Sequence, residues 1–418
     1  MSATALRIVA TLAFTLIVSQ FFRTAVSPIA PEVMRDLSLT PEQLGLVTSA
    51  FFITFAAMQI PVGMMLDRFG PRRTVAGLLL FAVLGALQFS NARGFGGILA
   101  GQLLLGLGCS GVYMGGLVAA ARWFPADRFA TVAAFIVAFS NTGTMLSATP
   151  LLAAVDAIGW RGTYLWLALF TGALSVLVLL SVRDAPADHP FHARRRESLR
   201  EILAGTAAVF RYRLLLLLLP MAFVSYPAML VVRALWAGPY LADVHGLDGI
   251  ARGDVILYMS MAVVGGILLY GPLDRRFDTR KWVVVAGTVV TIGLLIALAL
   301  LPVPPLWLAG ALLVCFILCT SHYVLVVPHG KAFFPERLVG RTVTAVNLVV
   351  FVGVAVLQSI TGVIVGAFPE ASGGGVPETA YRAVFAFLAL CMVIALALYL
   401  RSEDVKPSEE RERARQAG

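Results

Sequence analysis

The sequence predicts an all-α membrane protein with twelve transmembrane helices in two pseudo-symmetric six-helix bundles. Of its 418 residues, 59% are hydrophobic and only 13% are charged, with a mean hydropathy of +0.87. That is too little charge to cover the surfaces of soluble domains. The apolar residues gather in blocks of about 20, the length that a helix needs to cross roughly 30 Å of hydrocarbon. The short alternating segments of a membrane β-barrel are absent, so helices must satisfy the backbone hydrogen bonds.

Twelve apolar blocks mark the predicted spans. In chain order they cover residues 7–33, 42–66, 74–92, 95–121, 129–154, 162–182, 214–241, 254–273, 281–301, 306–330, 340–367 and 380–400. The longest interruption, residues 183–213, is predicted to be a cytoplasmic central loop. It is either a plain linker or one that carries a short helix lying on the membrane surface. It divides an N-terminal bundle, residues 1–182, from a C-terminal bundle, residues 214–402, and the charged residues 403–418 are predicted to form a disordered cytoplasmic tail.

Lysine and arginine are concentrated in alternate loops. One set of loops carries Arg68, Arg72, Arg73, Arg122, Arg128, Arg194, Arg195, Arg196, Arg200, Arg275, Arg276, Arg280, Lys281, Lys331, Arg337 and Arg341. The other set offers single residues, namely Arg35, Arg93, Arg161, Arg252 and Arg382. Because loops rich in Lys and Arg stay in the cytoplasm, both termini are predicted to be cytoplasmic in a multi-pass protein of the bacterial inner membrane. The net charge of +9 therefore reflects orientation in the lipid bilayer, and no nucleic-acid partner is expected.

Four matches between the halves of the chain indicate an internal repeat. Each pairs residues 207 or 210 positions apart (274 − 67 and 233 − 23): Asp67-Arg68 with Asp274-Arg275, Trp123-Phe124-Pro125 with Phe333-Phe334-Pro335, Arg23 with Arg233, and Tyr113 with Tyr323. A near-constant offset predicts two homologous six-helix halves. In a parallel repeat of this kind, the substrate path lies at the interface between the halves, near the bilayer midplane.

The segment PVGMMLDRFGPRRTV, residues 61–75, follows the second predicted span. It resembles the signature loop of the major facilitator superfamily, with matches at Gly63, Asp67, Arg68, Gly70, Arg72 and Arg73. A degenerate second copy, GPLDRRFDTRK, places Asp274 and Arg275 at the equivalent loop of the second half. The resemblance covers essentially the whole chain. It implies the twelve-helix fold of that family, secondary transport, no enzymatic activity, and a loop that latches the two halves on the cytoplasmic side.

Individual residues of this loop have expected roles. Gly63 is expected to let neighbouring helices approach closely. Asp67 is expected to accept hydrogen bonds from the N-terminus of a neighbouring helix, and the arginines to pair with it, with other carboxylates or with lipid headgroups. The alternative, plain positive charge on the cytoplasmic side, would require neither the embedded aspartate nor the glycines.

One arginine lies deep inside the first span of each half. Charged groups at such depth are costly and mark substrate pathways. In the resembled fold the first helix of each half lines the cavity, so Arg23 and Arg233 are predicted to bind a small anion, as guanidinium groups bind carboxylate or phosphate. The alternative is that each pairs with a buried carboxylate or a helix end. Against it, spans four, five, seven, ten and eleven contain no central Asp or Glu, and Glu32 is about two and a half turns from Arg23.

Further polar groups are predicted to line the same path. They are Tyr113, Asn141, Tyr226, Trp236, His322, Tyr323, Asn347 and Gln358. The ones on spans four, five, ten and eleven could equally form hydrogen bonds between helices. His322 could titrate near neutral pH and carry a coupling proton, or could serve as such an inter-helix partner.

The sequence favours one function over two alternatives. The leading hypothesis is secondary active transport of a small organic anion, a carboxylate-type metabolite, by alternating access with proton symport, in a monomer. In support, FFRTAVSPIAPEVMRDLSL resembles bacterial family members that carry anionic metabolites. The first alternative is a drug or metabolite exporter, but NTGTMLSATP, residues 141–150, only partly resembles the fifth helix of drug antiporters, because it lacks their fuller glycine series. The second is a transporter-like sensor that moves nothing. With no GxxxxGK[ST] loop and all four cysteines in apolar segments, neither a cofactor nor a metal site is expected.

Overall fold

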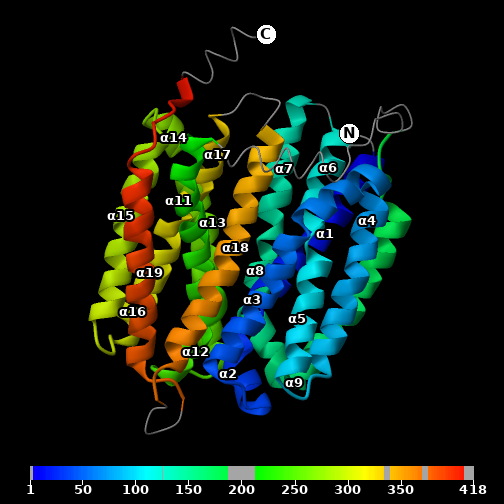
Figure 1. The fold of residues 1–418 in the computed structure, drawn as a ribbon. Coiled ribbons are helices and arrows are strands. Elements are labelled where there is room, and N and C mark those ends of the chain that lie inside the picture. Colours follow the sequence, from blue (N-terminus) through cyan, green and yellow to red (C-terminus); the bar gives the residue numbers. More distant parts are fainter. Residues whose placement is uncertain (1–2, 125, 187–211, 334–338, 370–374, 409–418) are drawn as a thin grey trace.

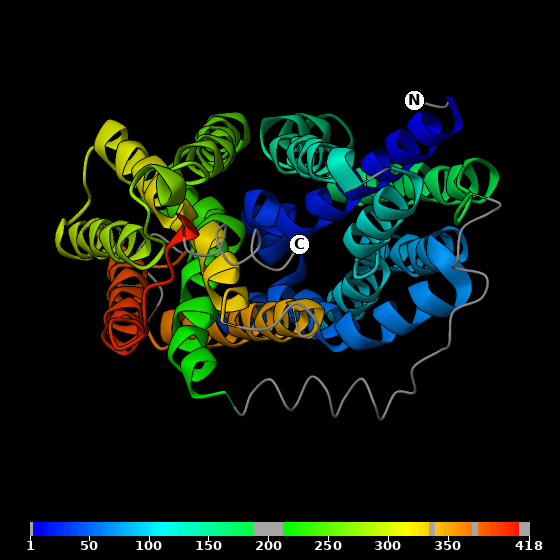
Figure 2. The ribbon, with the colours of Figure 1, turned by 90° about the horizontal axis from the view of Figure 1, so that it is seen from above.

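The computed structural model describes residues 3–124, 126–186, 212–333, 339–369 and 375–408, and every regular element within them is helical. Two bundles stand side by side, one formed by each half of the chain (Figures 1 and 2). The predicted fold class, twelve spans in two pseudo-symmetric bundles, is confirmed.

The N-terminal bundle is built from α1 to α9. These helices are α1 (Ala3–Thr24), α2 (Val26–Leu37), α3 (Pro41–Ala57), α4 (Gln59–Ser90), α5 (Phe95–Cys109), α6 (Val112–Trp123), α7 (Ala126–Ser140), α8 (Thr142–Leu146) and α9 (Thr149–Ser181). The long helices α4 and α9 each pass through a non-helical glycine, Gly70 with φ 77° and Gly159 with φ 70°. Positive φ suits glycine, and at each of these residues one span ends and the next begins.

The C-terminal bundle repeats this plan. Its elements are α11 (Arg213–Val231), the π-helical η2 (Val232–Trp236), α12 (Ala237–Asp243), α13 (Gly249–Tyr270), α14 (Leu273–Arg276), α15 (Lys281–Leu300), α16 (Leu306–Thr320), the 3-10 turn η3 (Ser321–Leu325), α17 (Val326–Lys331), α18 (Val339–Gly366) and α19 (Glu378–Tyr399). The start of α1 and the end of α19 lie at the same end of the molecule (Figure 1). We call it the termini end and the opposite one the far end.

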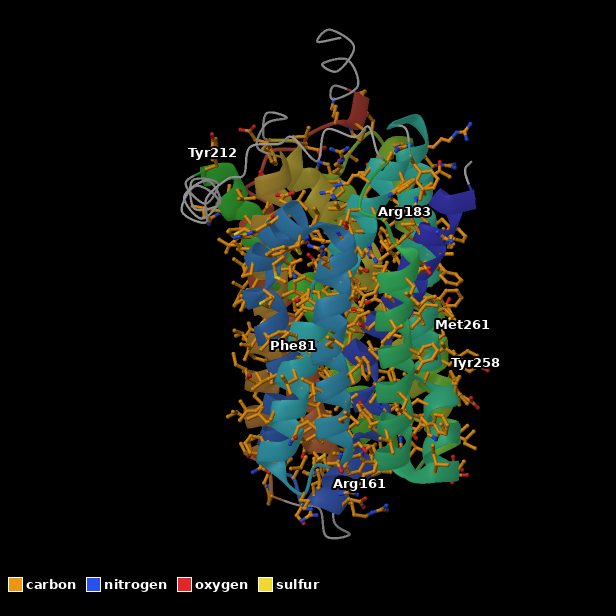
Figure 3. The ribbon with its side chains drawn as sticks, turned by 90° about the vertical axis from the view of Figure 1, so that its right-hand side faces the viewer. Phe81, Arg161, Arg183, Tyr212, Tyr258 and Met261 are labelled. Carbon is orange, nitrogen blue, oxygen red and sulfur yellow. The ribbon has the colours of Figure 1, made fainter. Side chains whose placement is uncertain are left out.

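Within the described ranges, ten helical segments are long and apolar enough to cross a membrane. The remaining spans are the second, formed by α3 with the first turns of α4, and the fifth, formed by α7, α8 and the start of α9. Exposed Phe81, Tyr258 and Met261 lie at mid-height on the outer surface, whereas Arg161 and Arg183 lie toward opposite ends (Figure 3). An apolar belt between two charged rims is the surface that a bilayer requires.

The internal repeat extends to two helix caps at the termini end. Asp184, just after the last span of the first half, accepts a hydrogen bond from the backbone N–H of Arg72 (2.8 Å). Asp404, just after the last span of the second half, accepts one from the backbone N–H of Lys281 (3.1 Å). Each carboxylate therefore caps the first turn of the third span of its own half, where free N–H groups and the helix dipole favour negative charge.

These caps correct part of the predicted C-terminal tail. Residues 403–408 were expected to be disordered, but Asp404 caps α15 and the backbone N–H of Ser408 donates to Asp278 (2.9 Å). Residues 409–418 of that tail, and residues 187–211 of the predicted central loop, lie outside the described residues.

A second pair of repeated hydrogen bonds ties the first span of each half to the last. Asp36 accepts from Trp160 Nε1 (2.9 Å), and Asp243 accepts from the Tyr381 hydroxyl (2.5 Å). The sequence offset had matched only arginines, tyrosines and loop motifs, whereas these bonds show the same connection made with different aromatic residues.

Glycines 210 positions apart (353 − 143) let the fifth span of each half touch the first. A Cβ on Gly143 would stand 2.1 Å from the carbonyl oxygen of Ile17, and one on Gly353 would stand 2.3 Å from that of Phe223. Both spans that carry the arginines are therefore held at backbone distance by a neighbour in their own half.

Candidate functional site

Arg23 lies in the last turn of α1, at the boundary between the halves. Its Nη1 donates to the Tyr226 hydroxyl of α11 (3.4 Å), and its Cζ lies 4.8 Å from the ring centroid of Phe55 and 5.5 Å from that of Phe351. Tyr226 and Phe351 belong to the C-terminal half, so this guanidinium reaches across the interface. The rings attract the cation without neutralising it, and Nε is buried with no hydrogen-bond partner.

Arg233 lies in the π-helical turn η2 of the seventh span and is 4% exposed. Its Nη1 donates to Ser260 Oγ on α13 (3.2 Å), and its Nε is also buried and unpaired. Ser260 Oγ in turn lies 3.3 Å from the carbonyl oxygen of Thr144, which belongs to the N-terminal half. Arg233 is thus a second cation at the interface, and this one is fully buried. Single π-helical turns often occur at functional sites.

Neither arginine has a carboxylate partner among the described residues, whose ion pairs join other groups. Glu32, the acidic residue nearest to Arg23 along the first span, pairs with Arg252 of α13. Taking a charge out of water without a counter-ion costs several kcal/mol. An anion bound between the two guanidinium groups would offset a penalty that the protein itself leaves uncompensated.

A cavity of about 130 Å³ adjoins Arg23 on the side of the C-terminal half. It shares Tyr226 and Phe351 with the surroundings of that arginine, and its walls are Ala222, Ser225, Tyr226, Tyr323, Val326, Val327, Asn347, Val350 and Phe351. The rings of Tyr226 and Tyr323 meet edge to face with centroids 4.8 Å apart. Both tyrosines lie near Arg233, and Tyr323 also lies near Arg23. The structure therefore brings five predicted site residues together: the two arginines, these tyrosines and Asn347.

Tyr113 and Gln358 lie close to this group. Tyr113, on α6, is 39% exposed and interacts electrostatically with Arg23. Gln358, on α18, lines a second and much smaller cavity together with Arg23, and both of its amide atoms are buried without a partner.

The other predicted residues have partners of their own. Asn141 Nδ2 donates to the Val137 carbonyl of its own helix (2.9 Å), and Trp236 Nε1 donates to Thr361 Oγ1 on α18 (3.0 Å). The His322 ring lies with Nδ1 2.9 Å from the Cys319 carbonyl and Nε2 3.0 Å from Thr288 Oγ1. His322 therefore has the inter-helix contact that was the alternative to proton transfer.

Hydrogen bonds at the far end join the two halves. Arg252 donates from Nε and Nη2 to the Pro28 carbonyl (3.2 and 3.0 Å) in addition to its ion pair with Glu32. The backbone N–H of Gly238 donates to Ser27 Oγ (3.1 Å). Arg252, which the sequence marked only as a single basic residue of a sparsely charged loop, is 3% exposed and links the first and eighth spans.

Two glycine contacts complete this junction, which we call the far-end seam. A Cβ on Gly45 of α3 would stand 2.9 Å from the Cα of Gly362 on α18, and one on Gly253 of α13 would stand 2.8 Å from the Cα of Thr149 on α9. The second span thus packs on the eleventh and the eighth on the fifth. These contacts close the chamber around the arginines toward the far end.

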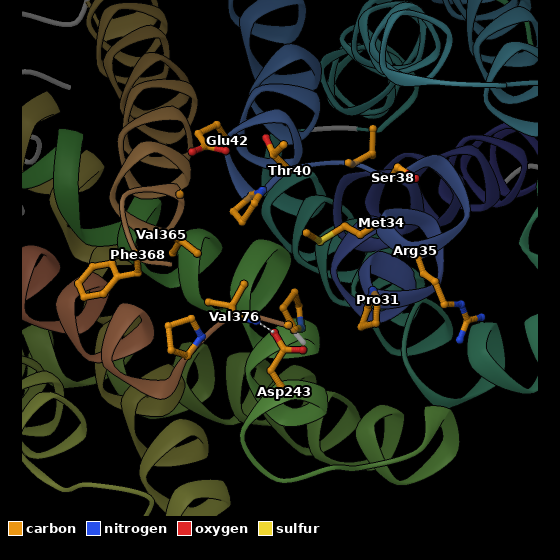
Figure 4. A pocket seen from close by; sticks show the side chains of 16 residues that line it. Pro31, Met34, Arg35, Ser38, Thr40, Glu42, Asp243, Val365, Phe368 and Val376 are labelled. Carbon is orange, nitrogen blue, oxygen red and sulfur yellow. Dashed lines mark hydrogen bonds between the residues drawn. The ribbon is translucent and has the colours of Figure 1, made fainter. Parts of the chain in front are cut away.

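A separate pocket of about 580 Å³ lies outside the seam at the far end (Figure 4). Both halves line it, with Arg35 and Glu42 from the first and Asp243 from the second. The Asp243 carboxylate is already bonded to the Val376 backbone N–H and the Tyr381 hydroxyl. Neither Arg23 nor Arg233 reaches this pocket.

The structure of the signature loop differs from two expectations. Nothing lies within 4 Å of a Cβ built on Gly63, so the expected close approach of helices at that residue is wrong. The glycine that excludes a side chain is Gly70, where φ is positive and a Cβ would stand 2.2 Å from Asp184 Oδ1. Asp67 is exposed and has no hydrogen bond to another described residue. Asp184, 112 residues beyond Arg72, is the carboxylate that meets the helix N-terminus instead.

The loop makes its hydrogen bonds within one half in this conformation. Arg72 Nε donates to the Leu179 carbonyl (2.7 Å), while Arg68 and Arg73 are exposed. In the second copy, buried Asp274 pairs with Arg280 (3.3 Å), and Arg275 is exposed. The predicted latch between the halves is therefore not formed between the described residues here.

The profile of the Major Facilitator Superfamily matches residues 12–357, which is most of the chain. The chain belongs to the Major Facilitator Superfamily. Its membership agrees with the two helical bundles and the signature loop, and members of this family are transporters, not enzymes.

Relatives within the superfamily include anion transporters. The chain is 26% identical, over 84% of each sequence, to a protein of Cupriavidus necator named probable sulfoacetate transporter SauU. It is 23% identical to the hexuronate transporter of Escherichia coli, over 65% of this chain and 67% of that one. Among solved structures, a bacterial homolog of the human lysosomal transporter Spinster, in an inward-facing and occupied conformation, has the same fold. That structure gives a TM-score of 0.79 with 18% identity, covering 96% of this chain and 97% of the other.

Proposed function

We propose that this protein is a secondary transporter that moves a small organic anion of the carboxylate type between its two halves. One observation carries the proposal: half-buried Arg23 and fully buried Arg233 lie near each other at the interface, with no carboxylate beside either of them in the described chain. An anionic cargo supplies the missing counter-charge, and a guanidinium group can bind a carboxylate through two parallel hydrogen bonds. The named cargoes of the relatives, sulfoacetate and hexuronate, are organic anions.

The closed far-end seam supports transport by alternating access. Binding groups near the middle of the molecule face a chamber that is shut on one side, and a rocking motion of the halves would exchange the closed side. The charge of the loops favours a cytoplasmic location for the termini end, and in that orientation this conformation faces inward. In the outward-facing state the signature loop would approach the second half and form the predicted latch.

Proton symport is the coupling we propose. An anion entering against an inside-negative membrane potential is driven outward by about 2.3 kcal/mol per charge at 100 mV, and co-transported protons would supply the compensating charge. His322 is poorly placed for this role, because both ring nitrogens already face partners within the C-terminal half. Uptake should rise when the outside of the vesicles is made more acidic.

Uptake by the purified protein in proteoliposomes tests the proposal. Labelled sulfoacetate and glucuronate are offered with and without a pH gradient to the wild type, to Arg23→Ala and to Arg35→Ala. Arg35 is the matched control, since its side chain is 79% exposed at the far end. We expect uptake by the wild type and Arg35→Ala, and none by Arg23→Ala. Export of organic cations instead would support the exporter alternative, and binding without flux would support a sensor.

A further inference from the structure

Two buried glutamines next to Arg23 have no hydrogen-bond partner. Gln102 on α5 is 1% exposed and Gln358 on α18 is fully buried, and Nε2 and Oε1 of both side chains are unpaired. Buried amides in proteins are nearly always hydrogen-bonded, because losing water without replacing it is unfavourable. Four unpaired amide atoms in one place therefore indicate a ligand that this conformation does not hold.

The two side chains share one cavity with the arginine. Gln102, Gln358 and Arg23 line a space of about 10 Å³, and the Nε of Arg23 is unpaired as well. The remaining walls are largely apolar, and the hydroxyl of Thr48 is already bonded to its own helix. A space of this size holds about one water-sized group. It is a subsite for a single oxygen atom attached to whatever Arg23 binds.

The glutamines come from opposite halves. Gln102 belongs to the fourth span and Gln358 to the eleventh, and the backbone carbonyl of Gln358 would lie 2.8 Å from a Cβ on Gly45, so Gln358 lies on the far-end seam. A group held by both amides would connect the halves at the seam. Its binding would therefore favour the closed arrangement.

The chemistry of the three side chains defines that group. Arginine only donates hydrogen bonds, and an anion oxygen only accepts them, so an arginine bound to an anion needs no further hydrogen-bonding group. Each amide offers two donors and one acceptor, and its carbonyl oxygen needs a donor that a carboxylate or nitrate oxygen lacks. A hydroxyl group both donates and accepts. An alcohol next to the acid group can donate to the carbonyl of one amide and accept from the NH2 group of the other, while the acid group binds the arginine.

We propose that Gln102 and Gln358 form a hydroxyl subsite, so that the cargo is a hydroxy acid whose carboxylate binds Arg23 and whose neighbouring alcohol lies between the two amides. This inference rests on the proposed function and narrows its substrate class. It favours cargoes of the hexuronate kind over anions without a hydroxyl, such as sulfoacetate.

Matched pairs of acids test the subsite in binding experiments on the purified protein in nanodiscs. Tartrate is compared with succinate and glycolate with acetate, because the members of each pair differ by hydroxyl groups alone. The wild type should bind the hydroxylated acid of each pair at least roughly 10-fold more tightly. In Gln102→Leu and Gln358→Leu that ratio should fall toward one, while affinity for succinate and acetate stays within about twofold. Gln88→Leu, an exposed glutamine on α4, should keep the wild-type ratio.

The melting temperature of the ligand-free variants provides a second readout. Removing an unpaired buried amide should raise it for Gln102→Leu and Gln358→Leu, and leave it unchanged for Gln88→Leu. Lower melting temperatures with an unchanged hydroxyl preference would show that the amides are structural and would overturn the inference. Equal binding of both members of each pair by the wild type would overturn it while leaving the proposed function intact. If none of the four acids bound, the inference would fail, whereas the uptake of labelled sulfoacetate and glucuronate would still decide the proposed function.

Discussion

Arg233 is 4% exposed and keeps one neutral hydrogen-bond partner, Ser260. Removing one member of a buried ion pair usually destabilises a protein, because it leaves the other charge alone. No such partner exists for Arg233 among the described residues, so removing its charge relieves desolvation instead. Stability and the proposed function therefore make opposite demands on this position.

We therefore predict that Arg233→Met raises the melting temperature of the ligand-free protein by a few degrees and lowers anion uptake at least roughly 10-fold. Arg161→Met is the control: this arginine pairs with Asp36 (3.4 Å) and stacks on Trp160, so its loss should lower the melting temperature and spare uptake. Thermal unfolding and uptake are measured on the same preparations. A destabilised Arg233→Met variant with normal uptake would assign the residue a structural role.

At the scale of helices, the far-end seam consists of backbone pressed against backbone. Gly45 meets Gly362, and Gly253 meets Thr149, at distances that leave no space for a side chain. Contacts of this kind form only when two helices come fully together, and any added atom holds them apart. Each contact joins the second span of one half to the fifth span of the other, so the internal repeat relates the two contacts and they open and close together.

Gly45→Leu and Gly253→Leu are each expected to hold the far end open. Distances between spin labels on the far ends of α3 and α18, measured by pulsed electron resonance, should lengthen by several ångströms, about the size of the added side chain. Uptake should fall because the far end cannot close, so the transport cycle cannot be completed. Gly293→Leu on α15, where nothing lies within 4 Å of a Cβ, should leave the distances unchanged. Unchanged distances in Gly45→Leu and Gly253→Leu would mean that the seam accommodates the added side chains without separation of the helices.

At the scale of the whole molecule, the chamber should be reachable from the termini end alone in this conformation. Tyr113→Cys, in a background with the native cysteines replaced by serine, places a thiol on the exposed side of α6 near Arg23. A membrane-impermeant maleimide should label it in inverted vesicles and much less in right-side-out vesicles, and glucuronate should protect it. Preferential labelling in right-side-out vesicles would reverse the proposed orientation.

The sequence predicted the fold well because each pattern that indicates it can be recognised without knowledge of three-dimensional contacts. Blocks of apolar residues mark helices that cross a bilayer, and the repeat offset pairs Arg23 with Arg233. The signature loop from Pro61 to Val75 indicates the family, and the family profile confirms this prediction.

The rest depends on contacts between distant residues. Gly63 was expected to be tightly packed but faces open space, since a motif does not show what lies opposite it. Asp184 and Asp404 cap helices more than a hundred residues away. Phe55 and Phe351 were missed because the chain has 26 phenylalanines and no pattern separates these two. Gln102 was overlooked as an ordinary polar residue in an apolar helix, because only the three-dimensional structure shows that it has no partner.

Arg23 and Arg233 are permanently charged and have no counter-ion in the described chain. We therefore expect them to limit the rate at which the empty transporter reorients. When the cargo leaves, the return stroke carries both guanidinium groups without any counter-ion through a low-dielectric barrier, whereas a bound carboxylate offsets part of that charge in the loaded stroke. Exchange of one anion for another should thus outrun net movement. Unlabelled glucuronate inside proteoliposomes is expected to accelerate entry of the labelled compound severalfold, and the absence of such acceleration would mean that something else neutralises the pair during the return.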